Sequence, residues 1–260
     1  MGALDDAVPF FADAEQLSKA GVLLAVPLLV TSGVLGVFKR LFGSLGPAFY
    51  GLRTTVVCLF LTALLRIKRP ESIKEYNPAE LGRIVGLDRM PEVKTQRRKL
   101  AALASAKKGE ELMRALAELR IEANPDLVGY LYVDGHTREY HGKHPLGKSH
   151  ITGRRISAPA ATDNWLGDER GDPLSLVPSE LNAGLTQALP EVLEAVREIV
   201  GKDRQVTVVF DRGGYSPKLF AKLKAADFDL LTYRKGKKDP VPLEEFTEVE
   251  VERNGKPEKW

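Results

Sequence analysis

The pattern of apolar residues changes near residue 122, and this change limits the folds that the chain can adopt. Before it, apolar residues recur at helical spacing in segments that Gly and Pro separate. After it, short β-branched and aromatic runs lie between turns rich in Gly and Asp. We therefore predict an α/β protein in which an all-helical region, residues 1–122, precedes a domain with a mixed sheet, residues 123–260.

The same patterns predict the individual elements. In the first region we expect helices at 13–42, 52–66, 78–85, 92–106 and 108–121. In the second, "DLVGYLYVDG", "ITGRRISAPA" and "DPLSLVPSE" are expected as strands, the first of them followed by a hairpin. A helix at about 186–200, the strand "QVTVVFD", a helix at 216–226 and the strand "FDLLTYRKG" complete the order.

The most apolar segment, "AGVLLAVPLLVTSGVLGVFKRLF" (20–42), approaches the length of a membrane-spanning helix. Pro27 and Gly33 interrupt it, and acidic residues precede it where a signal peptide carries positive charge. We therefore expect this segment and 54–65 to be buried helices of a soluble bundle, and the protein to be cytoplasmic with no membrane partner. A membrane-anchored protein is the alternative. Cys58 is the only cysteine, which excludes an intramolecular disulfide and a thiolate zinc cluster.

Charge is unevenly distributed along the chain. Residues 39–120 contain 17 Lys and Arg against 8 Asp and Glu, a net charge of +9, whereas the whole chain has a net charge of only +3. Such a split favours an electropositive face on the helical region. A solvated helical surface without a partner is the alternative interpretation.

Within this basic region, "NPAELGRIVGLDRMPEVKTQRRKLAALA" (77–104) pairs two helices across a turn and resembles a helix-turn-helix, although the turn is longer than usual. We expect the second helix to contact DNA through basic residues near its N-terminal half. These are Lys94, Arg97, Arg98 and Lys99. Arg212, which follows the strand "QVTVVFD", and Arg234 and Lys235, which follow the last strand, are further candidates for phosphate contact. A charged, solvated helix is the alternative for 92–106.

The strand "VTVVF" (206–210) is apolar on both faces, as a central strand covered by helices requires. Asp211 follows at its carboxyl end, the edge where open α/β sheets bind ligands. The next residues are two glycines, a serine suited to a helix N-cap and a proline suited to the first helical turn. The backbone thus accounts for the turn but not for Asp211, for which a solvated strand-end aspartate is the alternative.

Asp134 repeats the pattern, because it follows the apolar strand "GYLYV" and precedes a glycine. Two such aspartates in one sheet can come close enough that one would take up a proton unless a cation lay between them. Magnesium prefers one or two carboxylates together with water and substrate phosphate. Two such ions can activate a water and stabilise the leaving oxygen in phosphodiester cleavage.

The order of these elements, with "YLYVDGHTREYHGK" and "VVFDRGGYSPKLFAKLKAADFDLLTYRKG", resembles the prokaryotic insertion-sequence transposases. The resemblance extends from "FYGLRTTVVCLFLTALLRIKRPESI" to "TYRKGK". It implies a ribonuclease H-like catalytic domain with a DDE triad of acids, in which Asp134 matches the first acid and Asp211 the second. It also implies a two-ion site for Mg²⁺ or Mn²⁺, strand cleavage and transfer, and double-stranded DNA at the element ends as partner. A homodimer is left open.

The third acid of that triad would be a glutamate on a later helix. The 49 residues after Asp211 end in "FTEVEVERNGKPEKW", which alternates like a hairpin with an Asn-Gly turn. Glu245 and Glu248 lie at a suitable distance along the chain but at the start of this strand-like segment. Our interpretation is that the chain stops within an inserted segment, so that it binds DNA with little or no cleavage. A truncated, non-catalytic DNA-binding protein derived from a transposase is the alternative function.

All four histidines, His136, His141, His144 and His150, fall within 15 residues. Imidazole is a good zinc ligand, which makes a zinc site one interpretation of this segment. Neighbouring lysines and arginines would repel a cation, and the spacing matches no zinc motif. Contact with the DNA backbone and a plain polar loop are the other two interpretations.

Overall fold

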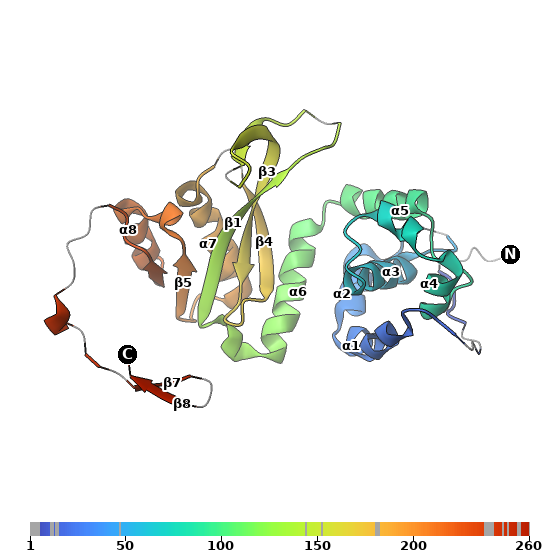
Figure 1. Ribbon diagram of the computed structural model, residues 1–260, viewed down its shortest axis with the longest axis horizontal. Helices are drawn as coiled ribbons and strands as arrows, with labels where there is room; N and C mark the ends of the chain where they lie inside the picture. The colour runs from blue at the N-terminus through green and yellow to red at the C-terminus, as the bar shows by residue number, and fades with distance from the viewer. Residues whose placement is uncertain are drawn as a thin grey trace.

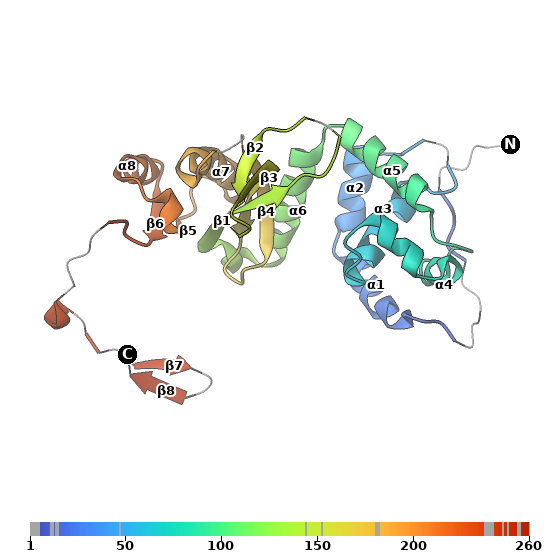
Figure 2. The same cartoon turned by 45° about the horizontal axis from the view of Figure 1, so that its top comes forward.

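The computed structural model describes residues 6–10, 13, 16–46, 48–143, 145–151, 153–179, 183–236, 242–245, 247–248, 250–253 and 256–259. A group of helices comes first and a mixed sheet with its own helices second (Figures 1 and 2). The predicted fold class, a helical region followed by a mixed sheet, is therefore confirmed.

The helical region contains eight described elements, most of them where the sequence predicted helix. They are η1 Ala20–Ala25, α1 Val26–Thr31, α2 Val34–Phe42, α3 Leu52–Leu64, η2 Pro70–Glu75, α4 Pro78–Ile84, α5 Val93–Ser105 and α6 Gly109–Ala123. The expected helix 13–42 is instead η1, α1 and α2, and Gly33, in a left-handed conformation with φ of 79°, lies between α1 and α2. The chain bends there by 60°.

Burial of the segment 20–31 is not what the sequence predicted. Leu24 is 87% exposed and Leu28 is 66% exposed, and only Leu29 of α1 is buried. The expectation of a fully buried helix is therefore wrong for this segment, because only one side of so short a helix meets the rest of the bundle. In the described parts of the chain no single helix is both long and apolar enough to cross a membrane, and only the bent pair Ala20–Thr31 and Val34–Phe42 meets those two criteria together.

The first turn of α3 is capped from a distance. Its N-cap residue is Gly51, which has no side chain to satisfy the free amides. The carboxylate of Asp6 takes that role, accepting hydrogen bonds from the backbone amides of Gly51 (2.9 Å) and Thr54 (3.1 Å) and from the Thr54 hydroxyl (2.5 Å). A carboxylate at a helix N-terminus is favourable because the first amides have no partner within the helix.

The second region is built on a six-stranded sheet. Its elements are η3 Pro125–Val128, β1 Tyr130–Glu139, β2 Lys148–Ile151, β3 Ile156–Gly167, β4 Pro173–Ser179, α7 Leu185–Val200, β5 Val206–Phe210, η4 Arg212–Gly214, α8 Pro217–Ala225 and β6 Phe228–Thr232. The strand order is β2-β3-β1-β5-β6, and β4 also pairs with β3. Strand β3 is antiparallel to β1, β2 and β4, whereas β1, β5 and β6 run parallel.

One expected strand, "ITGRRISAPA", divides in two. Ile151 ends β2 and Ile156 begins β3, and the two strands pair as a hairpin. The turn between them is closed by a hydrogen bond from the Arg154 amide to the Ile151 carbonyl (3.0 Å), and Arg155 adopts a φ of 53°. Four residues, 152–155, separate the two strands, and although they include Gly153 they contain no Asn-Gly or Asp-Gly pair of the kind that marks a two-residue hairpin turn.

One face of the sheet is packed against helices. Alternating residues of the parallel strands, among them Leu131, Val133, Val208 and Phe210, join a buried cluster to which α6, α7 and α8 also contribute. The intervening residues of the same strands point to the opposite face, where Tyr130, Tyr132 and Leu231 are 42–57% exposed, and Trp165 of the neighbouring strand β3 is 39% exposed on that face. We call this second surface the open face.

Two parts of the chain remain to be placed, helix α6 and the residues beyond β6. Helix α6 packs against both α2 and β4, and so joins the helical region to the sheet (Figure 1). Beyond β6, the 3-10 turn η5 Leu243–Glu245 precedes strands β7 Glu250–Arg253 and β8 Lys256–Lys259, which pair antiparallel. The predicted C-terminal hairpin is thus confirmed.

Candidate metal and nucleic-acid site

The two candidate metal ligands occupy neighbouring positions in the sheet. Strands β1 and β5 pair in parallel register, and their last partners are Val133 and Phe210. Asp134 and Asp211 are the residues that follow. Since neighbouring strands lie about 4.8 Å apart, the backbones of the two aspartates come close at this point. Both residues are exposed.

The alternation of the strands sets the direction of both side chains. Val133 and Phe210 point into the core. The next residue on each strand therefore points to the open face. Asp134 does not end its strand, contrary to the sequence-based expectation, because β1 continues to Glu139 through its pairing with β3, in which Asp134 is opposite Trp165. Asp211 does follow the end of β5.

The turn after β5 orients Asp211. One carboxylate oxygen, Oδ1, accepts a hydrogen bond from the Gly213 amide (2.9 Å), and the Thr232 hydroxyl donates to the Asp211 carbonyl (3.1 Å). A Cβ at position 213 would lie 2.8 Å from the same Oδ1, so that only glycine leaves the carboxylate in this position. The other carboxylate oxygen has no hydrogen bond to any described residue, which leaves it available for a ligand.

A third acid is not brought to this pair by the described residues. Glu245 is the last residue of η5, Glu248 follows it, and both are exposed. Across the described ranges, no group of three or more His, Cys, Asp or Glu residues could hold a metal ion. His136, His141 and His150 are part of that search, whereas His144 lies outside the described residues. The third member of the triad therefore stays a prediction, and the zinc interpretation gains no support.

Helix α5 presents three of its four candidate DNA-binding residues to solvent. Lys94, Arg97 and Arg98 are exposed. Arg97 forms an ion pair with Glu71 at 2.5 Å, and this hydrogen bond lowers the pKa of Glu71. Arg212 in η4 is exposed as well, and so are Arg234 and Lys235 after β6.

Lys99 is placed differently from the other basic residues of α5, because it is only 7% exposed. Gln96 and Lys99 lie three residues apart and both face the helical bundle. Burial lowers the pKa of the Lys99 ammonium, and the charge of Arg98 lowers it further, while Asp6 acts in the opposite direction. Lys99 is therefore less accessible to a phosphate than Lys94, Arg97 and Arg98, and its assignment to a DNA-binding surface stays a prediction. Its long apolar stem allows a lysine to occupy such an inward position.

Two aromatic residues beside Asp134 were not singled out from the sequence. Tyr132 lies two residues before Asp134 on the same face, and Trp165 is its cross-strand partner. They are 42% and 39% exposed. The period of two along β1 could have indicated Tyr132, but Trp165 depends on the pairing register of β1 and β3, which no local pattern specifies.

The fold and the site together define an α/β protein with a helical region, a mixed sheet and a pair of aspartates on neighbouring parallel strands. The chain belongs to a transposase family: the family model described as "Transposase protein" matches residues 1–258. No match to a curated protein was found.

Several solved structures are similar to this chain. One is the piggyBac transposase synaptic complex with hairpin DNA, with 12% identity and a TM-score of 0.42 over 77% of this chain and 47% of that one. Another is the Mos1 mariner paired end complex with Mn, with 9% identity and a TM-score of 0.28 over 68% of this chain and 58% of that one. A third is a pre-cleavage Mos1 transpososome, with 9% identity and a TM-score of 0.27 over 67% of this chain and 58% of that one. The chain thus spans about half of the length of the transposases it matches.

The exposed basic residues of α5 lead to a first prediction. Replacing Lys94 and Arg98 with alanine should weaken binding to a duplex and lower the slope of log affinity against log salt by about 1.8, because each phosphate contact contributes about 0.9. The measurement is a salt titration of fluorescence anisotropy. Lys222→Ala with Lys224→Ala, two exposed lysines of α8, is the charge-matched control. An unchanged slope in the α5 variant would show that the helix does not contact DNA.

Proposed function

We propose that this chain is a DDE transposase of the prokaryotic insertion-sequence type, acting in metal-dependent DNA cleavage and strand transfer. Residues 123–260 form the proposed ribonuclease H-like catalytic domain and residues 1–122 the proposed DNA-binding region. The observation that carries the proposal is the position of Asp134 and Asp211, which follow the paired residues Val133 and Phe210 on parallel strands. Membership of a transposase family supports it.

The two aspartates fit a divalent cation. Both are exposed on the open face, and neither forms an ion pair with a described lysine or arginine. Hard oxygen ligands of this kind suit Mg²⁺ or Mn²⁺. When bound, such ions would activate a water and stabilise charge on the leaving oxygen. The protein's own part is to hold the two carboxylates on a rigid sheet, with Gly213 fixing the orientation of Asp211.

Double-stranded DNA at the ends of a mobile element is the proposed substrate, bound by a monomer or a homodimer. The exposed arginines and lysines of α5, together with Arg212, Arg234 and Lys235, supply the charge that phosphates require. Arg212 follows Asp211 directly, so it would contact DNA next to the proposed metal ions.

A second candidate function is DNA binding without catalysis. The observation that favours it is that no third carboxylate, within the described ranges, joins Asp134 and Asp211. A misplaced or absent ligand would cost several kcal/mol of transition-state stabilisation, and each 1.36 kcal/mol is about tenfold in rate. We therefore expect little or no plasmid nicking by the 260-residue chain with Mg²⁺ or Mn²⁺. Clear metal-dependent nicking that is lost in Glu245→Gln or Glu248→Gln would identify the third acid and exclude the non-catalytic alternative.

Metal binding tests the proposed site directly. Titration of the protein with Mn²⁺, followed by electron paramagnetic resonance of the free ion, should show binding that weakens at least about tenfold in Asp134→Asn and in Asp211→Asn, since each substitution removes one of two charged ligands. Asp229→Asn, an exposed aspartate of β6, is the control. Equal Mn²⁺ affinity in wild type and both variants would rule out the metal site.

A further inference from the structure

One end of the sheet forms an extension, which we call the arm. It comprises β1 beyond Asp134, β2, the segment between these two strands, and residues 156–161 of β3. It projects from the sheet in both views (Figures 1 and 2). In the register of β1 with β3, His136 is opposite Asp163 and Arg138 is opposite Ala161. In the register of β2 with β3, Lys148 is opposite Pro159 and His150 is opposite Ser157.

These registers place four donors on one surface. Cross-strand partners share a face, and so do residues two apart along a strand. Positions 157, 159, 161, 163 and 165 of β3 therefore share a face, and their partners share it with them. That face carries Asp134, His136, Arg138, Lys148 and His150, and it is the open face. The donors thus continue from the proposed metal site along the arm.

The charge of this surface is almost entirely positive or neutral. His136, Arg138, Lys148 and His150 are all exposed. The carboxylate of Asp163 is buried and pairs with Arg138 at 2.7 Å, which fixes the guanidinium while 62% of the arginine side chain stays exposed. Glu139 belongs to the other face, where it pairs with Arg154. On the open face of β1, β2 and β3, among the residues that the structure describes, Asp134 is the only exposed carboxylate.

We propose that the open face of the arm binds the phosphate backbone of the DNA strand that enters the Asp134–Asp211 site. The inference rests on the proposed function. Arg138 is four residues beyond Asp134, a distance of about 13 Å along an extended strand. For a duplex whose axis runs along β1, with a rise of about 3.4 Å per nucleotide, the Arg138 contact would fall about four nucleotides from the phosphate at the aspartates. The strand β1 thereby fixes the spacing between the two contacts.

The geometry favours a polyanion over other occupants. The positive charges of Arg138 and Lys148 disfavour a cation on the arm itself, whereas they favour the negative charges of a phosphate backbone. The exposed aromatic side chains of the open face, Tyr132 and Trp165, lie beside Asp134, and the part of the face beyond them carries His136, Arg138, Lys148 and His150. His136 and Arg138 lie on β1 and Lys148 and His150 on β2, on the far side of β3, and in the register of β3 the four follow one another away from Asp134. An extended phosphate backbone matches that arrangement, since it can enter the site and contact the arm at once.

The first experiment measures the salt dependence of duplex binding. Lys148→Ala should lower the log–log salt slope of duplex binding by about 0.9, and Arg138→Gln with Lys148→Ala by about 1.8. Since Arg138→Gln leaves Asp163 without its partner, the single Lys148 variant keeps the test valid if the double variant unfolds. The control is again Lys222→Ala with Lys224→Ala. A slope equal to that of wild type in the Lys148 variant would overturn the proposal.

The second experiment uses a probe attached at a single position of the arm. Cys58 is 2% exposed and burial raises the pKa of its thiol to about 12, so a thiol-directed iron–EDTA reagent would label only an introduced cysteine. With Asp211→Asn present to remove intrinsic nicking, iron–EDTA at His150→Cys should cut a bound duplex, and the same reagent at Lys222→Cys should not. Cutting from position 222 alone, or from neither, would refute the arm contact.

The outcomes separate this inference from the function on which it rests. A wild-type chain that fails to bind any duplex would overturn both. Normal duplex binding that the α5 substitutions weaken and the arm substitutions leave unchanged would overturn only the arm contact. If the arm contacts DNA as proposed but Asp211→Asn does not change the affinity for Mn²⁺, the DNA-binding surface is supported and the metal site is refuted.

Discussion

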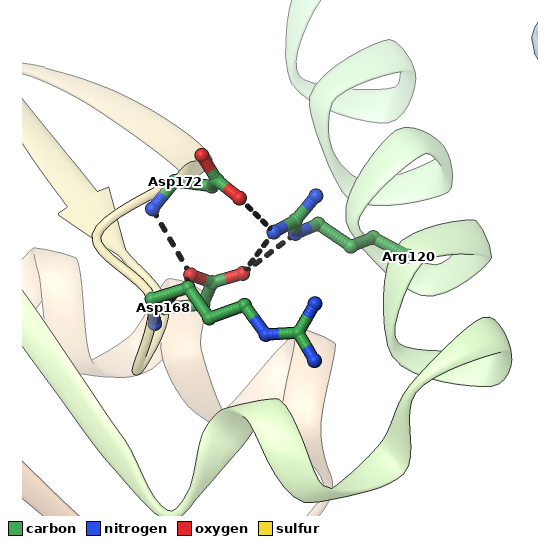
Figure 3. A network of polar contacts seen from close by, with 4 residues as sticks. Arg120, Asp168 and Asp172 are labelled. Carbon is green, nitrogen blue, oxygen red and sulfur yellow. Dashed lines mark hydrogen bonds and ion pairs between the residues drawn. The ribbon is translucent and has the colours of Figure 1, made fainter. Parts of the chain in front are cut away.

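Replacement of Arg120 with alanine is expected to lower the free energy of unfolding by about 3 kcal/mol, because it leaves a buried carboxylate without its cation. Asp168 is fully buried, and its Oδ2 accepts a hydrogen bond from Arg120 Nε at 2.6 Å. A second nitrogen of the same guanidinium pairs with Asp172, also at 2.6 Å (Figure 3). The contact joins the C-terminal part of α6 to the turn between β3 and β4.

The effect of losing Arg120 is large because Asp168 has few other partners. Its Oδ1 accepts from the backbone amides of Arg170 and Asp172, both at 3.0 Å, which organise the turn but do not neutralise the charge. Because 32% of the Arg120 side chain is exposed, solvent screens part of the interaction, which is why we place the effect at the lower end of the range for buried pairs.

The same helix provides a matched control. Arg114 also lies on α6 and pairs with Glu198 at 3.2 Å, but both side chains are about half exposed. Arg114→Ala should therefore change the free energy of unfolding by less than about 1 kcal/mol. Urea denaturation followed by circular dichroism measures both variants. Similar losses in the two would mean that the burial of Asp168 does not determine the strength of the Arg120 contact.

Gly82→Ala is expected to destabilise the helical region by about 3 kcal/mol, the upper end of the usual cost of overpacking. A Cβ at this position would lie 2.5 Å from the carbonyl carbon and 2.6 Å from the nitrogen of Arg89, both of them backbone atoms that cannot rotate away. Helix α4 would have to separate from the turn that leads to α5. Leu81, Ile84 and Met90, each 2% exposed, would lose part of their packing as it did so.

A second helical glycine serves as the control, with the opposite sign. Gly36 lies within α2, and a Cβ there would meet no atom within 4 Å. Gly36→Ala should therefore stabilise the protein by about 0.5–1 kcal/mol, since alanine loses less backbone entropy in a helix. Thermal unfolding of the two variants beside the wild type makes the comparison. A Gly82→Ala protein that is as stable as Gly36→Ala would show that the close approach to Arg89 is not present in solution.

Local signals in the sequence predicted most elements because each element depends on its own residues. Ser216 and Pro217 mark the start of α8, where the Ser216 hydroxyl accepts a hydrogen bond from the Leu219 amide (3.4 Å). The alternation of residues 250–259 around an Asn-Gly pair predicted the β7–β8 hairpin. The apolar run "VTVVF" predicted a strand that is packed within a sheet, and β5 lies between β1 and β6.

The candidate site was predictable only in part. The sequence placed Asp134 and Asp211 after apolar strand segments, but it did not specify that Val133 would pair with Phe210, on which their proximity depends. It also ended the first strand at the aspartate, because Gly135 resembles the start of a turn. Pairing with β3 holds that segment extended as far as Glu139, and so creates the arm.

What the sequence by itself determined is therefore local: which segments are helix or strand, where they are capped or turned, and which acidic residues follow apolar strands. Hydrogen bonding and side-chain periodicity within a few residues are enough to decide these features. The tertiary structure alone decided that Lys99 points inward, that Leu24 stays exposed and that Asp134 and Asp211 are neighbours. Each of these depends on which distant segment packs alongside, and no interaction within the segment itself distinguishes the alternatives.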